Sequence, residues 1–222
     1  TVSLTATVTD KDNDTASTSI DLGVKVGFRD DAPSVSTNTV STVLEVDETV
    51  LTSNDSENFA SAFTVNYGAD GAGSTVYSLG VSNAASGLTD VATGEAIVLS
   101  MSGSDVVGRT AIGNVEAFRI SVNGTGDVTL DQIRAITHPT GGNASPDELV
   151  RIAAGTVSLT ATVTDKDNDT ASTSIDLGVK VGFRDDAPVV TTNTVSTALE
   201  VDETVLTTDD SANFASAFTV NY

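Results

Sequence analysis

The residues with the clearest chemical potential are three alternating aspartates in a short loop. This loop occurs twice in the chain, as Asp10, Asp12 and Asp14 and again as Asp165, Asp167 and Asp169. Ca²⁺ takes six to eight oxygen ligands, largely from carboxylates and carbonyls, and tolerates irregular geometry. Alternating carboxylates in a tight loop can therefore converge on one Ca²⁺ ion. The alternative is a solvated acidic turn, because Asp and Asn are common turn residues.

The first of these loops is not an EF-hand. Its sixth position is Thr15, where an EF-hand has glycine, and its twelfth is Asp21. If the intervening residues form a strand, Asp21 lies about 23 Å from the loop, out of reach of the same ion.

A second acidic element is the motif Phe28-Arg-Asp-Asp-Ala-Pro33, which recurs at residues 183–188. Its proline fixes φ and pushes the preceding residue towards an extended conformation, so the motif has the character of a stiff linker. Its paired carboxylates are further candidate metal ligands: Asp30 and Asp31 in the first copy, Asp185 and Asp186 in the second.

A third acidic cluster also occurs twice, as Glu45, Asp47 and Glu48 and as Glu200, Asp202 and Glu203. It is a candidate for Ca²⁺ or, alternatively, a solvated strand end. A straight first strand would carry the cluster to the far end of the domain, whereas an early bend would leave it near the entry. Other carboxylates, such as Asp70 and Asp90, are interpreted as solubilising.

Composition limits the classes of function. The chain has 10 basic and 31 acidic residues, a net charge of −21, which argues against nucleic acid or an anionic membrane surface as partner. It has no cysteine, so disulfides and thiolate metal sites are excluded. No apolar run is long enough to span a membrane. Catalysis is not expected, because His138 is the sole histidine and is interpreted as a surface or hydrogen-bonded residue.

The elements that must position these residues are repeated. Thr1–Tyr67 recurs as Thr156–Tyr222, an offset of 155 residues, with differences only at positions 34, 36, 43, 53, 54 and 57. We therefore interpret the chain as a window on a tandem array. The expected organisation is a C-terminal hairpin of one repeat (1–29), a linker (30–33), a complete repeat (34–184), a second linker (185–188) and the start of another repeat (189–222).

Apolar residues alternate with Thr and Ser over 2–28, which predicts a β-hairpin around the first acidic loop. Short alternating segments continue through the chain, and residues 131–137 could form a helical turn. Nine or ten short strands with frequent turn signals predict an all-β fold of immunoglobulin-like β-sandwich repeats joined end to end. Each period could instead divide into two small sandwiches.

Strand length suggests how two of the acidic elements meet. If residues 171–183 form one strand of about 40 Å ending at the far linker, the loop Asp165–Asp169 lies at the near end of the domain. The linker with Asp30 and Asp31 enters there. We therefore expect Asp30 and Asp31 to share a Ca²⁺ site with that loop, about 135 residues along the chain.

The segments Thr9-Asp-Lys-Asp-Asn-Asp-Thr15, Ile20-Asp-Leu-Gly23 and Phe28–Pro33 resemble the tandem repeats of RTX-type adhesins. So do residues 130–138 and 44–49. The resemblance implies an extender domain of a large bacterial surface protein exported by type I secretion. In such proteins strings of β-sandwiches, made rigid by Ca²⁺, hold an adhesive tip away from the cell and support cell adhesion and biofilm formation.

The resemblance thus implies a stalk on the bacterial cell surface, with neighbouring repeats of the same chain as its partners. The near identity of the copies also favours a stalk, since a spacer can be multiplied unchanged. A binding module that grips a glycan or another surface is the alternative, because multivalent binding also exploits copies.

Overall fold

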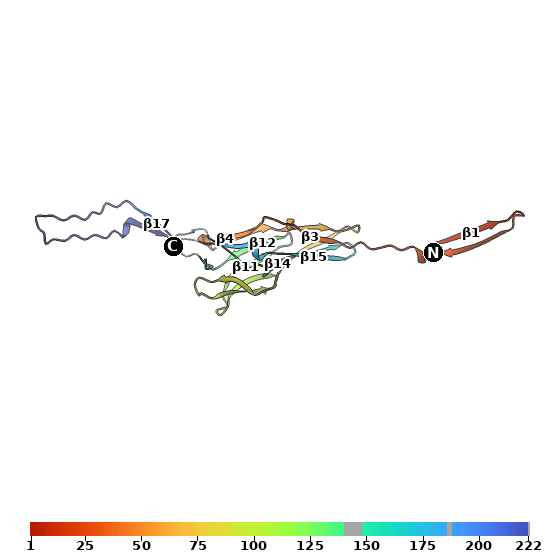
Figure 1. The fold of residues 1–222 in the computed structure, drawn as a ribbon, viewed down its shortest axis with the longest axis horizontal. Coiled ribbons are helices and arrows are strands. Elements are labelled where there is room, and N and C mark those ends of the chain that lie inside the picture. Colours follow the sequence, from red (N-terminus) through yellow and green to blue (C-terminus); the bar gives the residue numbers. More distant parts are fainter. Residues whose placement is uncertain (140–147, 186–187, 222) are drawn as a thin grey trace.

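The computed structural model describes residues 1–139, 148–185 and 188–221. Three parts lie in line: an N-terminal hairpin, a central body, and a C-terminal segment that extends from the opposite end of the body (Figure 1). The described residues form strands, 3-10 turns and loops. In this part of the chain no helix is long and apolar enough to cross a bilayer.

The N-terminal hairpin consists of β1 (Ser3–Thr9) and β2 (Thr15–Asp21), followed by the 3-10 turn η1 (Gly23–Lys25). The strands pair antiparallel from Ser3 opposite Asp21 to Thr9 opposite Thr15. The alternating Thr, Ser, Val and Ala residues favour this extended pairing. Together β1 and β2 form a two-stranded sheet, and all residues of both strands are exposed.

One layer of the central body is a six-stranded antiparallel sheet in the order β5-β12-β11-β10-β9-β8. Its strands are β5 (Asp55–Asn58), β8 (Ala85–Thr89), β9 (Ala96–Ser102), β10 (Asp105–Thr110), β11 (Glu116–Val122) and β12 (Asp127–Gln132).

The other layer is made of three smaller sheets. Their orders are β15-β14-β7, β13-β16-β4 and β3-β6. All pairs are antiparallel except β16 with β4, which run parallel. The strands are β3 (Ser34–Thr37), β4 (Leu44–Asp47), β6 (Phe63–Asn66), β7 (Ala72–Val81), β13 (Leu149–Arg151), β14 (Val157–Asp165), β15 (Thr170–Asp176) and β16 (Val181–Arg184). The 3-10 turns are η2 (Glu48–Val50), η3 (Ala60–Ala62) and η4 (Gly178–Lys180).

A single hydrophobic core joins the two layers. Phe118 of β11 packs on Phe183 of β16 with ring centroids 5.1 Å apart, and both side chains are fully buried. The same core includes Leu44, Leu130 and Leu159 from other strands. The prediction of an all-β sandwich is therefore confirmed.

The structure corrects two details of the predicted strands. The single strand expected over 171–183 is interrupted by η4, so β15 pairs with β14 whereas β16 pairs with β13 and β4. Because of this break, residues 170–184 contribute strands to two different sheets. The length of about 40 Å expected for one continuous strand over 171–183 therefore does not apply. The possible helical turn at 131–137 is also absent: β12 runs to Gln132, and Ile136 forms an isolated bridge with Asp90.

Within its described residues, 188–221, the C-terminal segment forms a two-stranded sheet. It contains β17 (Val189–Thr192), the turn η5 (Ala215–Ala217) and β18 (Phe218–Asn221). β17 pairs with β18 in the register that β3 uses with β6. The copies of β4 and β5 are not strands in this segment.

Candidate cation sites

The first candidate site is built on the turn between β14 and β15. Asn168 adopts a positive φ of 79°, which asparagine tolerates better than most residues. The Asp165 carboxylate closes the turn, with Oδ1 accepting a hydrogen bond from the Asp169 amide at 2.8 Å. Ligand atoms of Asp165, Asp167 and Asp169 then lie within 4.8 Å of one another. The turn thus gathers the three alternating carboxylates at one point.

Asp165 is the buried member of this group, since only 2% of its surface is exposed. Its Oδ2 is buried and accepts no hydrogen bond from any residue that the structure describes. Burial raises the pKa of Asp165, and the adjacent Asp167 carboxylate raises it further. A buried carboxylate oxygen with no donor is costly, and a cation would satisfy it.

The preceding linker contributes Asp30 to the same place. Ligand atoms of Asp30, Asp70 and Asp167 lie within 4.8 Å of one another, so Asp167 belongs to both groups. The charge of Asp30 is the main reason that the pKa of Asp169 is raised. The structure therefore brings the linker beside the turn that begins 135 residues later. Asp70, interpreted from sequence as solubilising, is exposed and also lies within this group, which the sequence did not indicate.

Asp31 lies differently from its neighbour. Its Oδ2 accepts a hydrogen bond from the Ala69 amide at 2.9 Å. Gly68 has a φ of +73°, which favours glycine, and a Cβ there would lie 2.8 Å from the same oxygen, so any other residue would strain this contact. Asp31 thereby holds the loop that carries Asp70. Among the described residues, the groups of converging ligand atoms do not include Asp31.

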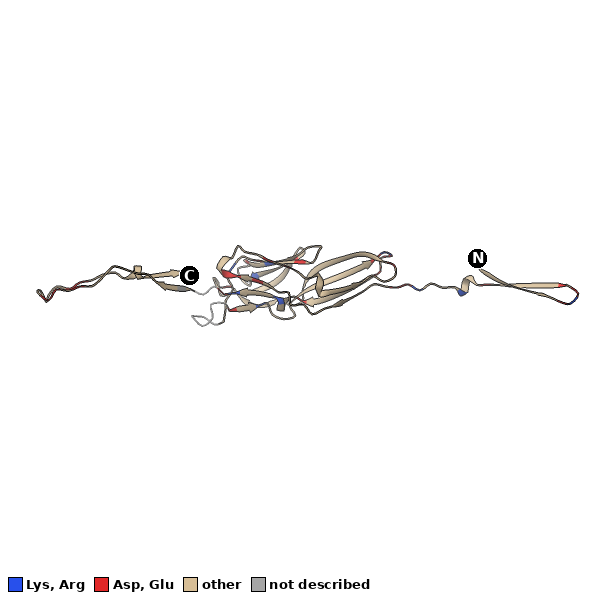
Figure 2. Cartoon of the chain, turned by 90° about the horizontal axis from the view of Figure 1, so that it is seen from above, with Lys and Arg blue, Asp and Glu red and all other residues tan. Residues whose placement is uncertain are grey.

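The N-terminal hairpin repeats the turn without its surroundings. Ligand atoms of Asp10, Asp12 and Asp14 also lie within 4.8 Å of one another, but all three residues are exposed. They occupy the free tip of the hairpin, far from the central body (Figure 2). The Asp10 side chain accepts from the Asp14 amide at 2.9 Å, as its copy Asp165 does from Asp169. The conformation of the turn therefore depends on local sequence, whereas the burial of its first aspartate depends on packing against the central body.

The third acidic cluster is dispersed by the fold. Glu45 lies between Arg151 and Arg184, each 2.5 Å from one of its oxygens. Burial opposes ionisation of Glu45, but the two guanidinium groups outweigh it and lower its pKa. Asp47 instead caps η2, accepting from the Thr49 amide at 2.9 Å. Each carboxylate of the cluster thus has its own partners, and the three do not form one site.

The parallel pairing of β4 with β16 places this cluster at the far end of the domain. Asp47 is in register with Arg184, so Glu48 follows one strand as Asp185 follows the other. Ligand atoms of Glu48, Asp185 and His138 lie within 4.8 Å of one another. The interpretation of His138 as a surface or hydrogen-bonded residue is therefore corrected: its side chain is 4% exposed, and neither ring nitrogen has a hydrogen-bond partner among the described residues.

The remaining candidate ligands expected from the sequence lie in the C-terminal segment or outside the described residues. Glu200, Asp202 and Glu203 are exposed. The Glu200 amide donates to Asp210 at 2.9 Å, as the Glu45 amide does to Asp55 at 2.8 Å. Asp186 lies outside the described residues.

Asp90 is structural and not the solubilising residue expected from sequence. It is fully buried, and Arg134 binds both its oxygens at 2.7 and 2.9 Å. The Arg134 guanidinium is the main cause that lowers the pKa of Asp90 to about 2.

This ion pair predicts an acid-dependent loss of stability. Because the folded pKa is depressed, the contribution of Asp90 is fully present above its ordinary pKa and is lost as pH falls through about 2. We expect the difference in unfolding free energy between wild type and Asp90→Asn to shrink by about 2 kcal/mol from pH 5 to pH 2. Urea unfolding at each pH measures this, and a constant difference would contradict it.

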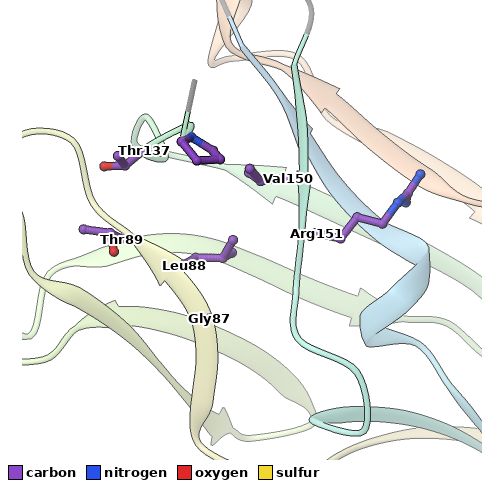
Figure 3. A pocket seen from close by; sticks show the side chains of 7 residues that line it. Gly87, Leu88, Thr89, Thr137, Val150 and Arg151 are labelled. Atoms are coloured by element: carbon purple, nitrogen blue, oxygen red, sulfur yellow. The ribbon is translucent and has the colours of Figure 1, made fainter. Parts of the chain in front are cut away.

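A hollow of about 390 Å³ lies between β8 and β13. Leu88, Thr89 and Val150 are among the residues that line it, and no aromatic residue does. Figure 3 shows the Arg151 side chain directed away from Leu88 and Thr89, and its charge is taken up by Glu45. The hollow therefore offers little of the stacking or charged contact by which a sugar or anion is held.

Comparison with known families gives one match. The profile of the family described as Domain of unknown function (DUF5801) matches residues 43–178, more than half of the chain. The chain belongs to this family. The DUF5801 match covers Asp70, Glu48, His138 and the turn Asp165–Asp169, and leaves both linkers outside. No curated protein and no solved structure matches the chain.

Proposed function

We propose that this chain is a stalk module of a secreted bacterial surface adhesin, in which Ca²⁺ at the junctions between repeats stiffens the string. Its role is to project a distal adhesive region for cell adhesion or biofilm formation. One observation carries the proposal: Asp30 of the linker lies beside Asp167 in the turn of the following domain, next to a buried Asp165 oxygen that lacks any hydrogen-bond donor.

The charge balance of this junction supports a bound cation. It gathers five carboxylates: Asp30, Asp70, Asp165, Asp167 and Asp169. In the part of the chain that the structure describes, none of these five forms an ion pair. Their repulsion raises the pKa of Asp169 and adds to the effect of burial on Asp165. Ca²⁺ takes six to eight oxygen ligands, which five carboxylates can supply because each has two oxygens, and the ion would replace the repulsion between them with attraction.

The arrangement of the parts suits a stalk. The hairpin and the C-terminal segment leave the central body at opposite ends, so successive repeats extend in line (Figure 1). The cation would join a residue that precedes the domain to a turn near the end of the domain. The linker can then be clamped only after the domain has folded.

The absence of cysteine allows a direct test of stiffness. Spin labels at Lys25→Cys, next to the linker, and Ser100→Cys, on β9, report the distance between hairpin and body; both positions are exposed. We expect double electron–electron resonance to give a broad distribution of the distance between the two labels in chelator and a narrow distribution in Ca²⁺. Asp167→Asn should remain broad in Ca²⁺, whereas the matched change Asp12→Asn at the hairpin tip should narrow like wild type. Identical distributions with and without Ca²⁺ would remove calcium from the mechanism.

A further inference from the structure

A second group of potential ligands closes the opposite end of the domain. Glu48 begins η2, His138 lies on the connection after β12, and Asp185 follows β16. These three come from both layers of the sandwich. One ligand atom from each lies within 4.8 Å of the others.

The state of the His138 side chain is the evidence that this group is a ligand-binding site and not an incidental cluster of acidic residues. Among the described residues, five buried side-chain polar atoms lack a hydrogen-bond partner, and two of them are Nδ1 and Nε2 of His138. The Nε2 atom is 3.8 Å from Glu48 Oε1, beyond hydrogen-bond range. Buried ring nitrogens without partners are costly, so a missing ligand is the direct explanation.

The carboxylate side of the group is held in place. Glu48 Oε1 accepts from the Ile136 amide at 2.6 Å and from Gln132 Nε2 at 2.8 Å. The Asp185 amide donates to the Glu148 carbonyl at 2.8 Å, which fixes the start of the outgoing linker. Such outer contacts are typical of oriented metal ligands.

We propose that Glu48, His138 and Asp185 form a binding site for a divalent transition-metal cation of the Zn²⁺ class. Imidazole nitrogen suits Zn²⁺ and its neighbours, whereas Ca²⁺ selects oxygen. Three protein ligands leave a fourth tetrahedral position for water. The bound ion fastens the outgoing linker to both layers of the domain that precedes it.

The repeat gives the site a consequence for the linker. Asp185 is the copy of Asp30, which at the other end of the domain lies beside Asp70 and Asp167. The same linker position therefore faces the preceding domain in one copy and the following domain in the other. Where two complete domains follow each other, one aspartate can serve an imidazole-containing site behind it and an all-carboxylate site ahead.

Since the chain has a single histidine, its ring signals report the site directly. The experiment titrates Zn²⁺ into the full ¹⁵N-labelled chain, with Ca²⁺ in excess to occupy the carboxylate groups. We expect the His138 ring nitrogen signals to shift to a new position at one equivalent of Zn²⁺. Ca²⁺ alone should leave them unmoved. A ring that ignores Zn²⁺, or that responds equally to Ca²⁺, overturns the proposal.

Variants test the ligand set. Calorimetry should show Zn²⁺ binding weakened by roughly a hundredfold or more in Glu48→Gln and in Asp185→Asn, because loss of a direct ligand costs at least as much as loss of an outer contact, which costs about 10- to 100-fold. Glu203→Gln, the exposed copy of Glu48, is the matched control and should bind as wild type. Wild-type affinity in both site variants overturns the assignment. The calcium-dependent narrowing of the distance distribution between labels at 25 and 100 depends on the carboxylates around Asp30 and Asp167. The proposed Ca²⁺ junction and the proposed Zn²⁺ site can therefore fail separately.

Discussion

Saturating Ca²⁺ is expected to raise the midpoint of thermal unfolding of this chain by roughly 5–10 °C, and Asp165→Asn combined with Asp167→Asn should abolish most of that rise. A ligand that binds only the folded state at a hundred times its dissociation constant adds about 2.7 kcal/mol. For a domain of this size each kcal/mol corresponds to about 2–4 °C. Scanning calorimetry in Ca²⁺ and in chelator measures both quantities.

In chelator, the same double substitution should increase the stability of the protein instead of decreasing it. Without a cation, burial and the neighbouring carboxylates disfavour the charged form of Asp165, as its raised pKa shows. Replacing that charge with a neutral amide relieves the repulsion. We therefore expect the variant to be more stable than wild type in chelator and less stable in Ca²⁺. If these aspartates had a purely structural role, the double substitution would instead destabilise the protein both in chelator and in Ca²⁺.

The pH dependence of the calcium-free protein has a definite sign. The folded-state pKa values of Asp165 and Asp169 are raised, so the folded state binds protons more readily than the unfolded state. Their unfavourable contribution is present at neutral pH and is relieved as pH falls through the raised values towards the ordinary pKa of aspartate. The double variant should lose the part of this gain that comes from Asp165. It should keep the part that comes from Asp169, whose pKa is raised mainly by the charge of Asp30.

The chain supplies its own control for this prediction. Asp10→Asn with Asp12→Asn makes the same change in the same local sequence, at a turn that is exposed and away from the body. That variant should keep the full calcium-induced rise. If it lost the rise as well, the relevant ion would be held by the turn alone and not by the junction.

Phe183→Ala is expected to lower the free energy of unfolding of the domain by about 3–5 kcal/mol, the usual cost of emptying a buried phenylalanine position. Phe183 is fully buried and packs on Phe118. Its sequence copy Phe28 is 97% exposed. Phe28→Ala should therefore change stability by less than about 0.5 kcal/mol.

Urea unfolding followed by tyrosine fluorescence measures this difference, because Tyr67 and Tyr77 lie in the central part of the chain. The two substitutions occur in identical local sequence, so any contrast between them comes from tertiary packing. Equal losses would show that the N-terminal hairpin is buried in solution.

Much of the fold could be predicted because strand periodicity is a local signal. The alternation over 2–28 predicts a hairpin, and both copies form it in equivalent registers. The break of the last strand at η4 was missed, because nothing local shows that one segment will pair in two sheets. The converging acidic turn could be anticipated from spacing, since neighbouring aspartates in a turn meet without help.

The parts of the sites that were missed depend on distant residues. Asp70 is one of several acidic residues beside glycine, and only the packing of its loop on Asp31 brings it to the junction. His138 gives no sequence signal beyond being the sole histidine. Its burial next to Glu48 and Asp185 follows from the parallel register of β4 and β16, which a single sequence does not reveal.

The acidic turn thus illustrates what sequence and tertiary structure each determine. By itself the sequence determines the hairpin, its register and the positive φ of the turn asparagine, 75° at Asn13 and 79° at Asn168, because these depend on neighbours along the chain. Tertiary structure alone decides that Leu159 is buried while its copy Leu4 is 58% exposed. Of the two described hairpins, the one that contains β14 pairs with β7 and packs on the core, so its side chains are shielded from solvent. In that hairpin, the buried Asp165 Oδ2 has no hydrogen-bond partner.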